Sequence, residues 1–136
     1  MPARFLLDTN ICIYIIRHKP AEVRERFERL EAGAAVLSVI TFGELQFGIA
    51  KSRHAAAAAR TLSELITHLP VLPLPAEAGV EYGRLRAAAE AKGTPVGNND
   101  LWIAAHAKAA GLTLVSNNLR EFRRLPGLRL ENWVRA

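Results

Sequence analysis

A short apolar run that ends on a carboxylate places the strongest constraint on the fold. Phe5-Leu6-Leu7 is apolar throughout, and Asp8-Thr9-Asn10 follows it directly. An apolar run without polar alternation is typical of a strand buried on both faces of a parallel sheet. Because ligands gather outside the carboxyl ends of such strands, we expect Asp8 to lie at a functional edge. An Asp in this position also caps helices and closes Asx turns, so Asp8 alone does not decide between the two roles.

The rest of the chain alternates between strand-like and helix-like segments. The other expected strands cover residues 35–40, 71–74, 112–115 and, at an edge, 128–133. The expected helices cover residues 11–16, 20–30, a segment starting at Thr41, 54–68, 76–92 and 101–107. Strands alternating with helices predict an α/β fold with a parallel sheet and right-handed crossovers, which places all strand carboxyl ends on one edge.

Length and composition predict one intracellular domain. A chain of 136 residues, 50% of them hydrophobic, is long enough to bury one core and needs no second domain. Its one cysteine, Cys12, excludes an internal disulfide and a cysteine zinc cluster, and fits the reducing cytoplasm. No apolar run has the length of a signal peptide or of the roughly 20 residues of a membrane helix. We therefore expect a soluble cytoplasmic protein without a membrane partner.

Further polar residues follow the predicted strands as Asp8 does. Glu44 comes shortly after the second strand, and Asp100 stands in the first turn of an apolar helix, after a loop rich in turn-forming residues. Asn117 and Asn118 follow the strand over 112–115. All these side chains are therefore expected within a turn of the same sheet edge.

Each of these residues also has an ordinary structural explanation. Thr41-Phe42-Gly43-Glu44 has the form of a capping box, and this pattern alone favours Thr41 as a helix cap with Glu44 as its partner. Asp100 suits the positive end of a helix dipole, and Asn118 with Glu121 is a further possible cap. His106 is expected to be a hydrogen-bonded helix residue rather than a ligand.

The convergence of the acids favours chemistry over capping. Carboxylates gathered at one edge repel one another, and a hard cation is the usual reason to tolerate this. A bound Mg²⁺ keeps waters for its substrate, polarises a phosphate and lowers the pKa of an attacking water. The formal net charge of +5, with Arg123, Arg124 and Arg129 near the carboxyl end, favours nucleic acid as the partner. The residues therefore predict a metal-dependent nuclease.

The ordered motifs resemble those of the PIN-domain family, and in particular those of VapC toxins from VapBC toxin–antitoxin systems. The motifs are LLDTN at 6–10, SVITFGEL at 38–45, NDLWIAAHA at 99–107 and LVSNN at 114–118. The resemblance implies a single PIN domain over 1–136. Its fold would be a PIN-like three-layer sandwich with a central parallel sheet of four to five strands flanked by helices.

The resemblance also implies roles for the site residues. Asp8 and Asp100 would be the principal metal ligands, with Glu44 assisting directly or through water. Many members have a fourth acid where this chain has Asn118, so a neutral ligand or water-positioning group stands there, which weakens the expectation of a second Mg²⁺. The cofactor would be Mg²⁺, with Mn²⁺ as a substitute, and the catalytic set would be Asp8, Glu44, Asp100 and Asn118.

The reaction implied by the resemblance is hydrolysis of an RNA phosphodiester, leaving 5′-phosphate and 3′-hydroxyl ends. The tail, REF at 120–122 with GLRLENW at 127–133, resembles members that cut initiator tRNA in its anticodon loop. The implied partners are RNA, a cognate VapB antitoxin and a second copy of the chain, in a homodimer that assembles into a larger complex. Apolar helices over 11–16 and 42–47, beside the acidic edge, offer the antitoxin a groove.

Two other classes of protein share parts of this pattern. A haloacid-dehalogenase-like phosphatase also begins with a strand that ends in Asp, but it needs a second Asp where this chain has Asn10. A non-catalytic α/β domain that binds a small ligand or a protein needs no acidic cluster at all. A Mn²⁺ ion bound beside Asp8 would separate the nuclease from this second alternative.

Overall fold

A central parallel sheet of five strands organises the chain in the computed structural model, which describes residues 2–135. The strand order is β3-β2-β1-β4-β5, and every pair of neighbours is parallel. The strands are β1 (Phe5–Leu7), β2 (Ala35–Ser38), β3 (Val71–Leu72), β4 (Thr113–Val115) and β5 (Leu130–Glu131). The helices are α1 (Thr9–Arg17), α2 (Ala21–Glu28), α3 (Val39–Ala50), α4 (Ala55–Leu65), α5 (Glu77–Ala91), α6 (Asn98–Ala110) and α7 (Leu119–Phe122).

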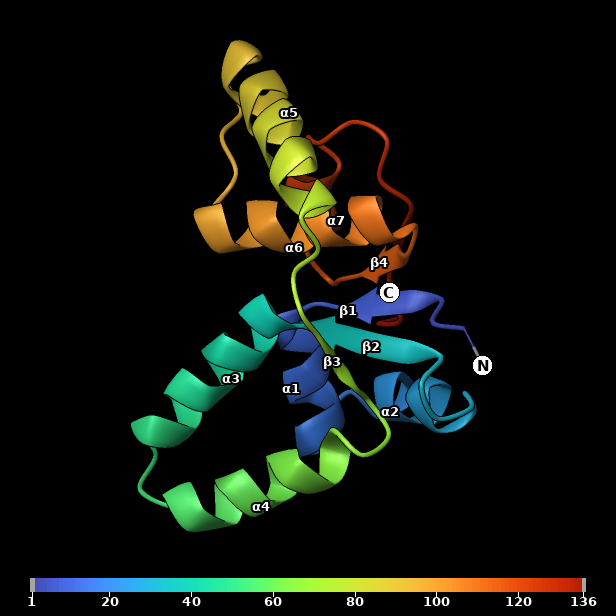
Figure 1. Cartoon of the computed structure of the whole chain (residues 1–136). Coiled ribbons are helices and arrows are strands. Elements are labelled where there is room, and N and C mark those ends of the chain that lie inside the picture. The colour runs from blue at the N-terminus through green and yellow to red at the C-terminus, as the bar shows by residue number, and fades with distance from the viewer. Residues whose placement is uncertain (1, 136) are drawn as a thin grey trace.

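The helices cover both faces of the sheet, which confirms the predicted three-layer sandwich. Figure 1 shows α5, α6 and α7 on one side of the strands and α1 to α4 on the other. Alternate residues of β1 face opposite layers, as the two-residue period of a strand requires. Leu6 packs in the core cluster with α5 and α6, whereas Phe5 and Leu7 pack in the cluster with α1, α2 and α4. Both faces of the strand are therefore buried, which explains its unbroken apolar sequence.

Helix α6 is the most buried helix of the layer above the sheet. His106, on its inner side, is 1% exposed, and its Nδ1 lies 2.8 Å from the hydroxyl of Ser38. Burial lowers the pKa of His106, which keeps the ring neutral. The structure thus confirms His106 as a hydrogen-bonded helix residue.

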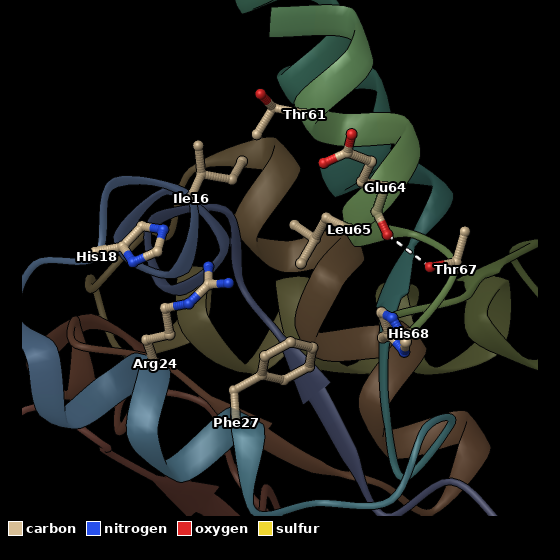
Figure 2. A pocket seen from close by; sticks show the side chains of 9 residues that line it. All are labelled: Ile16, His18, Arg24, Phe27, Thr61, Glu64, Leu65, Thr67 and His68. Atoms are coloured by element: carbon tan, nitrogen blue, oxygen red, sulfur yellow. Dashed lines mark hydrogen bonds between the residues drawn. The ribbon is translucent and has the colours of Figure 1, made fainter.

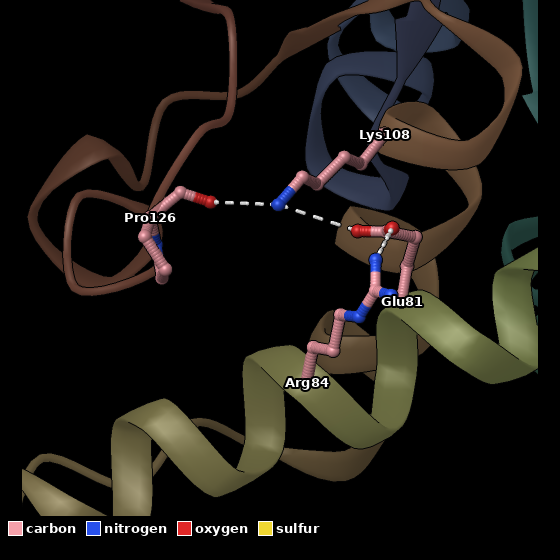
Figure 3. Close-up of polar contacts among 4 residues, drawn as sticks. All are labelled: Glu81, Arg84, Lys108 and Pro126. Carbon is pink, nitrogen blue, oxygen red and sulfur yellow. Dashed lines mark hydrogen bonds and ion pairs between the residues drawn. The ribbon is translucent and has the colours of Figure 1, made fainter.

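Helix α5 projects from the body and is held to α6 by polar contacts at its base (Figure 1). Lys108 of α6 lies 3.2 Å from Oε2 of Glu81 and donates to the carbonyl oxygen of Pro126 at 3.5 Å. Arg84 lies 3.3 Å from the other oxygen of Glu81, on the exposed side (Figure 3). Lys108 therefore links α6 to the base of α5 through Glu81, whereas Arg84 contacts Glu81 within α5.

The boundary between β2 and α3 lies earlier than the sequence predicted. Ser38, and not Thr41, is the N-cap of α3, because its hydroxyl accepts a hydrogen bond from the Ile40 N–H at 3.2 Å. The strand therefore ends at Ser38 instead of continuing to residue 40, and Thr41 is a buried residue inside the helix. Glu44 consequently lies in the second turn of α3, so the predicted capping box is wrong.

Most other predicted elements are present but shorter. The edge strand predicted over 128–133 is reduced to the two residues of β5, and the strand over 71–74 is reduced to β3. Pro73 prevents continuation of β3 because proline cannot donate to a ladder. Within residues 2–135, none of the helices combines the length and the apolarity needed to cross a bilayer.

Candidate active site

Asp8 is held rigidly at the carboxyl end of the central strand. It is 5% exposed, Oδ1 accepts the Ile11 N–H at 2.9 Å and Oδ2 accepts the Ser116 hydroxyl at 2.5 Å. Asp8 is therefore the N-cap of α1 as well as a member of the acidic cluster. Burial raises its pKa most, the two hydrogen bonds lower it, and the nearby Glu44 raises it again.

Glu44 reaches the same region from α3. Its Oε1 accepts a hydrogen bond from the Thr9 hydroxyl at 2.5 Å, and Thr9 is the first residue of α1, next to Asp8. The Thr41 hydroxyl lies 3.5 Å from that of Thr9. Thr9 therefore holds the carboxylate near the end of β1, an interaction that replaces the predicted cap.

Asp100 approaches from the opposite layer, in the first turn of α6. Its pKa is raised to about 6, first by burial and then by the negative charges of Glu121, Asp8 and Glu44. Each of these charges acts on Asp100 from a different segment of the chain. The structure thus brings Asp8, Glu44 and Asp100 into one electrostatically coupled cluster at the edge of the sheet.

Glu121 is a fourth acid of this cluster that the sequence analysis did not include. It stands on the short helix α7, accepts the Gly97 N–H at 3.1 Å, and is the carboxylate that raises the pKa of Asp100 most. The sequence signal was present, because Glu121 lies six residues after Val115, the last residue of β4. It was assigned instead to a cap with Asn118.

Asn118 contacts this cluster through Glu121. Asn118 is the N-cap residue of α7, as predicted, but its side chain accepts no backbone N–H there. Its amide donates instead to Oε2 of Glu121 at 2.7 Å. Asn117 points elsewhere: its amide donates to the Tyr14 hydroxyl and its carbonyl oxygen accepts from Asn132, both at 3.3 Å. Of the two asparagines, Asn118 is therefore the one beside the acids.

Ser116 is the second residue of the site that the sequence analysis did not assign. It is fully buried, donates to Asp8, and accepts the Asn118 N–H at 2.8 Å. It therefore links the end of β4 to the carboxylate at the end of β1. Such hydrogen bonds fix the orientation of a metal-binding carboxylate.

Replacing Ser116 by alanine is expected to lower RNA cleavage by about 10-fold, in the range found for such supporting residues. The variant loses the hydrogen bond that lowers the pKa of Asp8, so that pKa should rise further. Carboxyl NMR of the metal-free protein measures the pKa directly, and a thermal melt checks the fold. An unchanged Asp8 titration would show that the serine does not hold this carboxylate in solution.

An apolar groove begins at the acidic cluster and runs away from it. Its volume is about 310 Å³, and it lies between α1, α3 and α4, with Thr9 and Glu44 at one end. The apolar lining residues are Ile13, Ile16, Leu45, Ile49, Ala58 and Leu62. The groove predicted beside the acidic edge is therefore present, and α4 forms its third wall.

A larger cavity lies elsewhere. It measures about 660 Å³ and is located where α1 and α4 end beside α2, at the far end of α1 from Asp8 (Figure 2). Its one carboxylate, Glu64, lies among the basic side chains of His18, Arg24 and His68. This cavity is therefore separate from the acidic cluster.

The sequence and structure have close known relatives. A family model described as "PIN domain" matches residues 5–128. The tRNA(fMet)-specific endonuclease VapC of Salmonella typhimurium is 44% identical over 96% of this chain and 98% of its own length. The structure of DNA-bound VapBC from Salmonella typhimurium superposes with a TM-score of 0.90 at 43% identity, over 97% of this chain and 99% of the other. The structure of VapBC2 from Rickettsia felis bound to a promoter DNA fragment gives a TM-score of 0.89 at 39% identity, over 98% of this chain and 100% of the other.

The fold and the gathered acids define a nuclease of the PIN class. The chain belongs to the PIN-domain family and, within it, to the VapC ribonucleases. The family match decides against the phosphatase and against the non-catalytic binding domain. Ribonucleases of this class generally depend on a divalent metal ion.

The donor set fits a hard divalent cation. The side chains that meet at the edge offer carboxylate oxygens, and the pKa of Asp100 is raised first by burial and then by the neighbouring carboxylates. Within residues 2–135, no three His, Cys, Asp or Glu side chains are grouped tightly enough to hold an ion by themselves. Waters and substrate phosphates would therefore have to complete the coordination of a divalent cation held here.

Proposed function

We propose that the chain, acting as one PIN domain, hydrolyses RNA at the acidic cluster with Mg²⁺, or Mn²⁺ in its place. The supporting observation is the convergence of Asp8, Glu44 and Asp100, which stand at the end of β1, in α3 and in α6: Glu44 raises the pKa of Asp8, and both raise the pKa of Asp100. Nothing in a purely structural role requires three acids to meet at one strand edge. The arrangement suits a metal-dependent phosphodiesterase.

Each residue has a task that follows from its surroundings. Asp8 is the rigid ligand, since its hydrogen bonds to Ile11 and Ser116 leave little rotational freedom. Asp100 is the ligand that must lose a proton to bind metal, and Glu44, oriented by Thr9, assists. A divalent cation bound there would polarise the scissile phosphate and lower the pKa of the attacking water.

Asn118 acts through Glu121 in this proposal. Its amide donates to one oxygen of Glu121 while Gly97 donates to the other, so the carboxylate is held facing Asp100. Glu121 then supplies the fourth negative charge that many relatives place at the position of Asn118. The role of Asn118 is to position this charge.

We further propose initiator tRNA, cut in its anticodon loop, as the substrate. The support is the 44% identity to a relative named as a tRNA(fMet)-specific endonuclease. Brief expression followed by sequencing of RNA 5′ ends tests the proposal, and the cuts are expected to cluster in that loop. Cuts confined to other RNAs would overturn the tRNA assignment, and no new ends at all would overturn the ribonuclease proposal.

The similar solved structures are VapBC complexes, so we propose a VapB antitoxin as the inhibitor and a homodimer inside a larger toxin–antitoxin assembly. We also propose a cytoplasmic location, because an RNA substrate is found in that compartment. The antitoxin segment would occupy the apolar groove between α1, α3 and α4. A basic antitoxin side chain at the Glu44 end would neutralise the carboxylates as a metal does.

Placing a charge in the groove should release the toxin from its antitoxin. Ala58→Glu puts a carboxylate into the apolar lining, and we expect antitoxin affinity to fall by about 100-fold because that charge would be desolvated on binding. Ala59→Glu, one residue along α4 and exposed, is the matched control and should bind normally. Calorimetry with purified antitoxin measures both. Equal affinities for the two variants would remove the groove as the binding surface.

A further inference from the structure

A smaller cavity lies beside the start of α6, between it and α5. Its volume is about 340 Å³. It is lined by Arg86 and Glu90 of α5, Asn98 and Leu101 of α6, and Pro95 and Val96 of the loop between the helices. Figure 1 shows this loop descending from the top of α5 to the first turn of α6. The two α6 residues flank Asp100 in sequence, so the cavity lies within one helical turn of the acidic cluster.

The polar side chains of this cavity are held in place by one another. Arg86 donates from Nε to Glu90 at 2.8 Å and from Nη1 to the Tyr82 hydroxyl at 3.0 Å. The Tyr82 hydroxyl in turn donates to the side-chain oxygen of Asn98. One network thus joins the basic, acidic and amide groups of the cavity.

A stacked pair of aromatic rings joins this network on α5 to α6. The Tyr82 ring stacks on Trp102 with ring centroids 3.9 Å apart and an interplanar angle of 14°. Trp102 follows Asp100 by two residues on α6. The stack therefore ties the position of Arg86 on α5 to the helix turn that carries Asp100.

The composition of the cavity suits a flat group with apolar faces and a polar edge. Pro95, Val96 and Leu101 offer apolar walls, whereas Arg86, Glu90 and Asn98 offer donors and acceptors. An unpaired nucleobase has these properties, and proteins read RNA mainly through such splayed-out bases. The volume lies at the lower end of the roughly 300–1,000 Å³ typical of small-ligand sites, which suits one nucleotide and not a duplex.

We propose that the cavity between α5 and α6 binds one unpaired nucleotide of the RNA substrate, next to the phosphate that is cut at Asp100. Arg86 and Asn98 hydrogen-bond the edge of the base, and Tyr82 and Trp102 keep these two side chains in position. Arg86 is therefore a specificity residue, one that selects and aligns the substrate without joining the reaction. The assignment rests on the proposed RNA cleavage.

The first test compares two arginines of the same helix. Arg86→Ala removes a guanidinium that lines the cavity, from a side chain that is 54% exposed. Arg84→Ala removes an equal charge from a side chain that is 72% exposed, contacts Glu81 and does not line the cavity. The probe is a synthetic RNA stem–loop with the cleavage site found by 5′-end sequencing. Both variants lose general attraction to phosphates equally. Only Arg86→Ala should in addition raise KM and weaken binding in EDTA by about 10-fold, with kcat little changed and an unaltered melting temperature.

The second test identifies the bound base. Each loop nucleotide of the probe is replaced in turn by an abasic ribose, and the affinity is measured for the parent protein and for Arg86→Ala. At one position beside the cut, the abasic probe should bind the parent protein about 10-fold more weakly but leave the affinity of the variant unchanged. Equal effects of the two arginine variants, or no coupled position, would overturn the cavity assignment while leaving RNA cleavage in place. Absence of any cleaved RNA would instead overturn the proposed function itself.

Discussion

Asp100→Asn is expected to reduce RNA cleavage by at least about 10³-fold. A metal-bound carboxylate supports several kcal/mol of transition-state stabilisation, and each 1.36 kcal/mol corresponds to a factor of ten in rate. Asparagine keeps the size and the hydrogen-bonding oxygen of the side chain but removes the charge that binds metal. Asp8→Asn should have the same effect for the same reason. Single-turnover cleavage of the mapped RNA site measures both losses.

The stability of the Asp100→Asn variant separates lost chemistry from lost folding. The folded protein raises the pKa of Asp100 to about 6, so it binds this proton more tightly than the unfolded chain does. The free energy of unfolding therefore falls as pH rises from about 4 to about 6, and the ionised Asp100 remains unfavourable above that range. Metal-free Asp100→Asn should then melt at or above the parent temperature at pH 8, with the advantage gone at pH 4.

A neighbouring asparagine supplies the matched control. Asn99→Ala changes an exposed residue in the same first turn of α6, so cleavage and melting temperature should stay close to those of the parent protein. An Asp100→Asn variant that still cleaves RNA would remove Asp100 from the site. An inactive variant that melts well below the parent protein would assign Asp100 a structural role instead.

The positions of Asp8 and Asp100 follow from local sequence because each stands where an element begins or ends. The apolar run before Asp8 has to be a buried strand, and the turn-rich loop before Asp100 has to lead into an apolar helix. Parallel connectivity then brings strand ends to one edge without any knowledge of side-chain contacts. This is why the fold, the sheet and the meeting of these acids could be predicted.

The surroundings of Glu44 and Glu121 depend on contacts distant in sequence. Glu44 fits a capping box by spacing alone, but its carboxylate accepts a hydrogen bond from the hydroxyl of Thr9, 35 residues earlier. Glu121 is three residues from Asn118 but is oriented by the amide of Gly97, 24 residues earlier. A spacing rule describes neighbours along the chain, so it cannot detect such partners.

The cavity at Arg86 could not be predicted for a related reason. On α5 alone, Arg86 and Glu90 form an ordinary pair of charges one turn apart, which is typical of an exposed helix face. The link to the active site arises only because Tyr82 and Trp102 stack across two helices. The functional interpretation of this arginine therefore depends on packing.

Removal of divalent metal is expected to abolish cleavage completely, and Mg²⁺ or Mn²⁺ should restore it. In the proposed mechanism the acids of the cluster would supply oxygen ligands and negative charge, and the ion would polarise the phosphate. Ca²⁺ should bind without restoring activity, since it adopts larger and looser coordination and activates water poorly. Cleavage assays in excess EDTA, followed by addition of each ion, provide the measurement.

The affinity for metal should also depend on pH, because of Asp100. Metal must displace the proton that this carboxyl retains up to about pH 6, so Mn²⁺ affinity should fall steeply as pH drops below that value. Calorimetry at pH 5 and pH 8 measures the change, and Asp100→Asn should bind weakly at both. Glu64→Gln, in the separate large cavity, is the matched control and should bind Mn²⁺ as the parent protein does. An Mn²⁺ affinity that does not change with pH would mean that Asp100 does not bind the ion. In the cleavage assay, full activity in excess EDTA would rule out the metal mechanism.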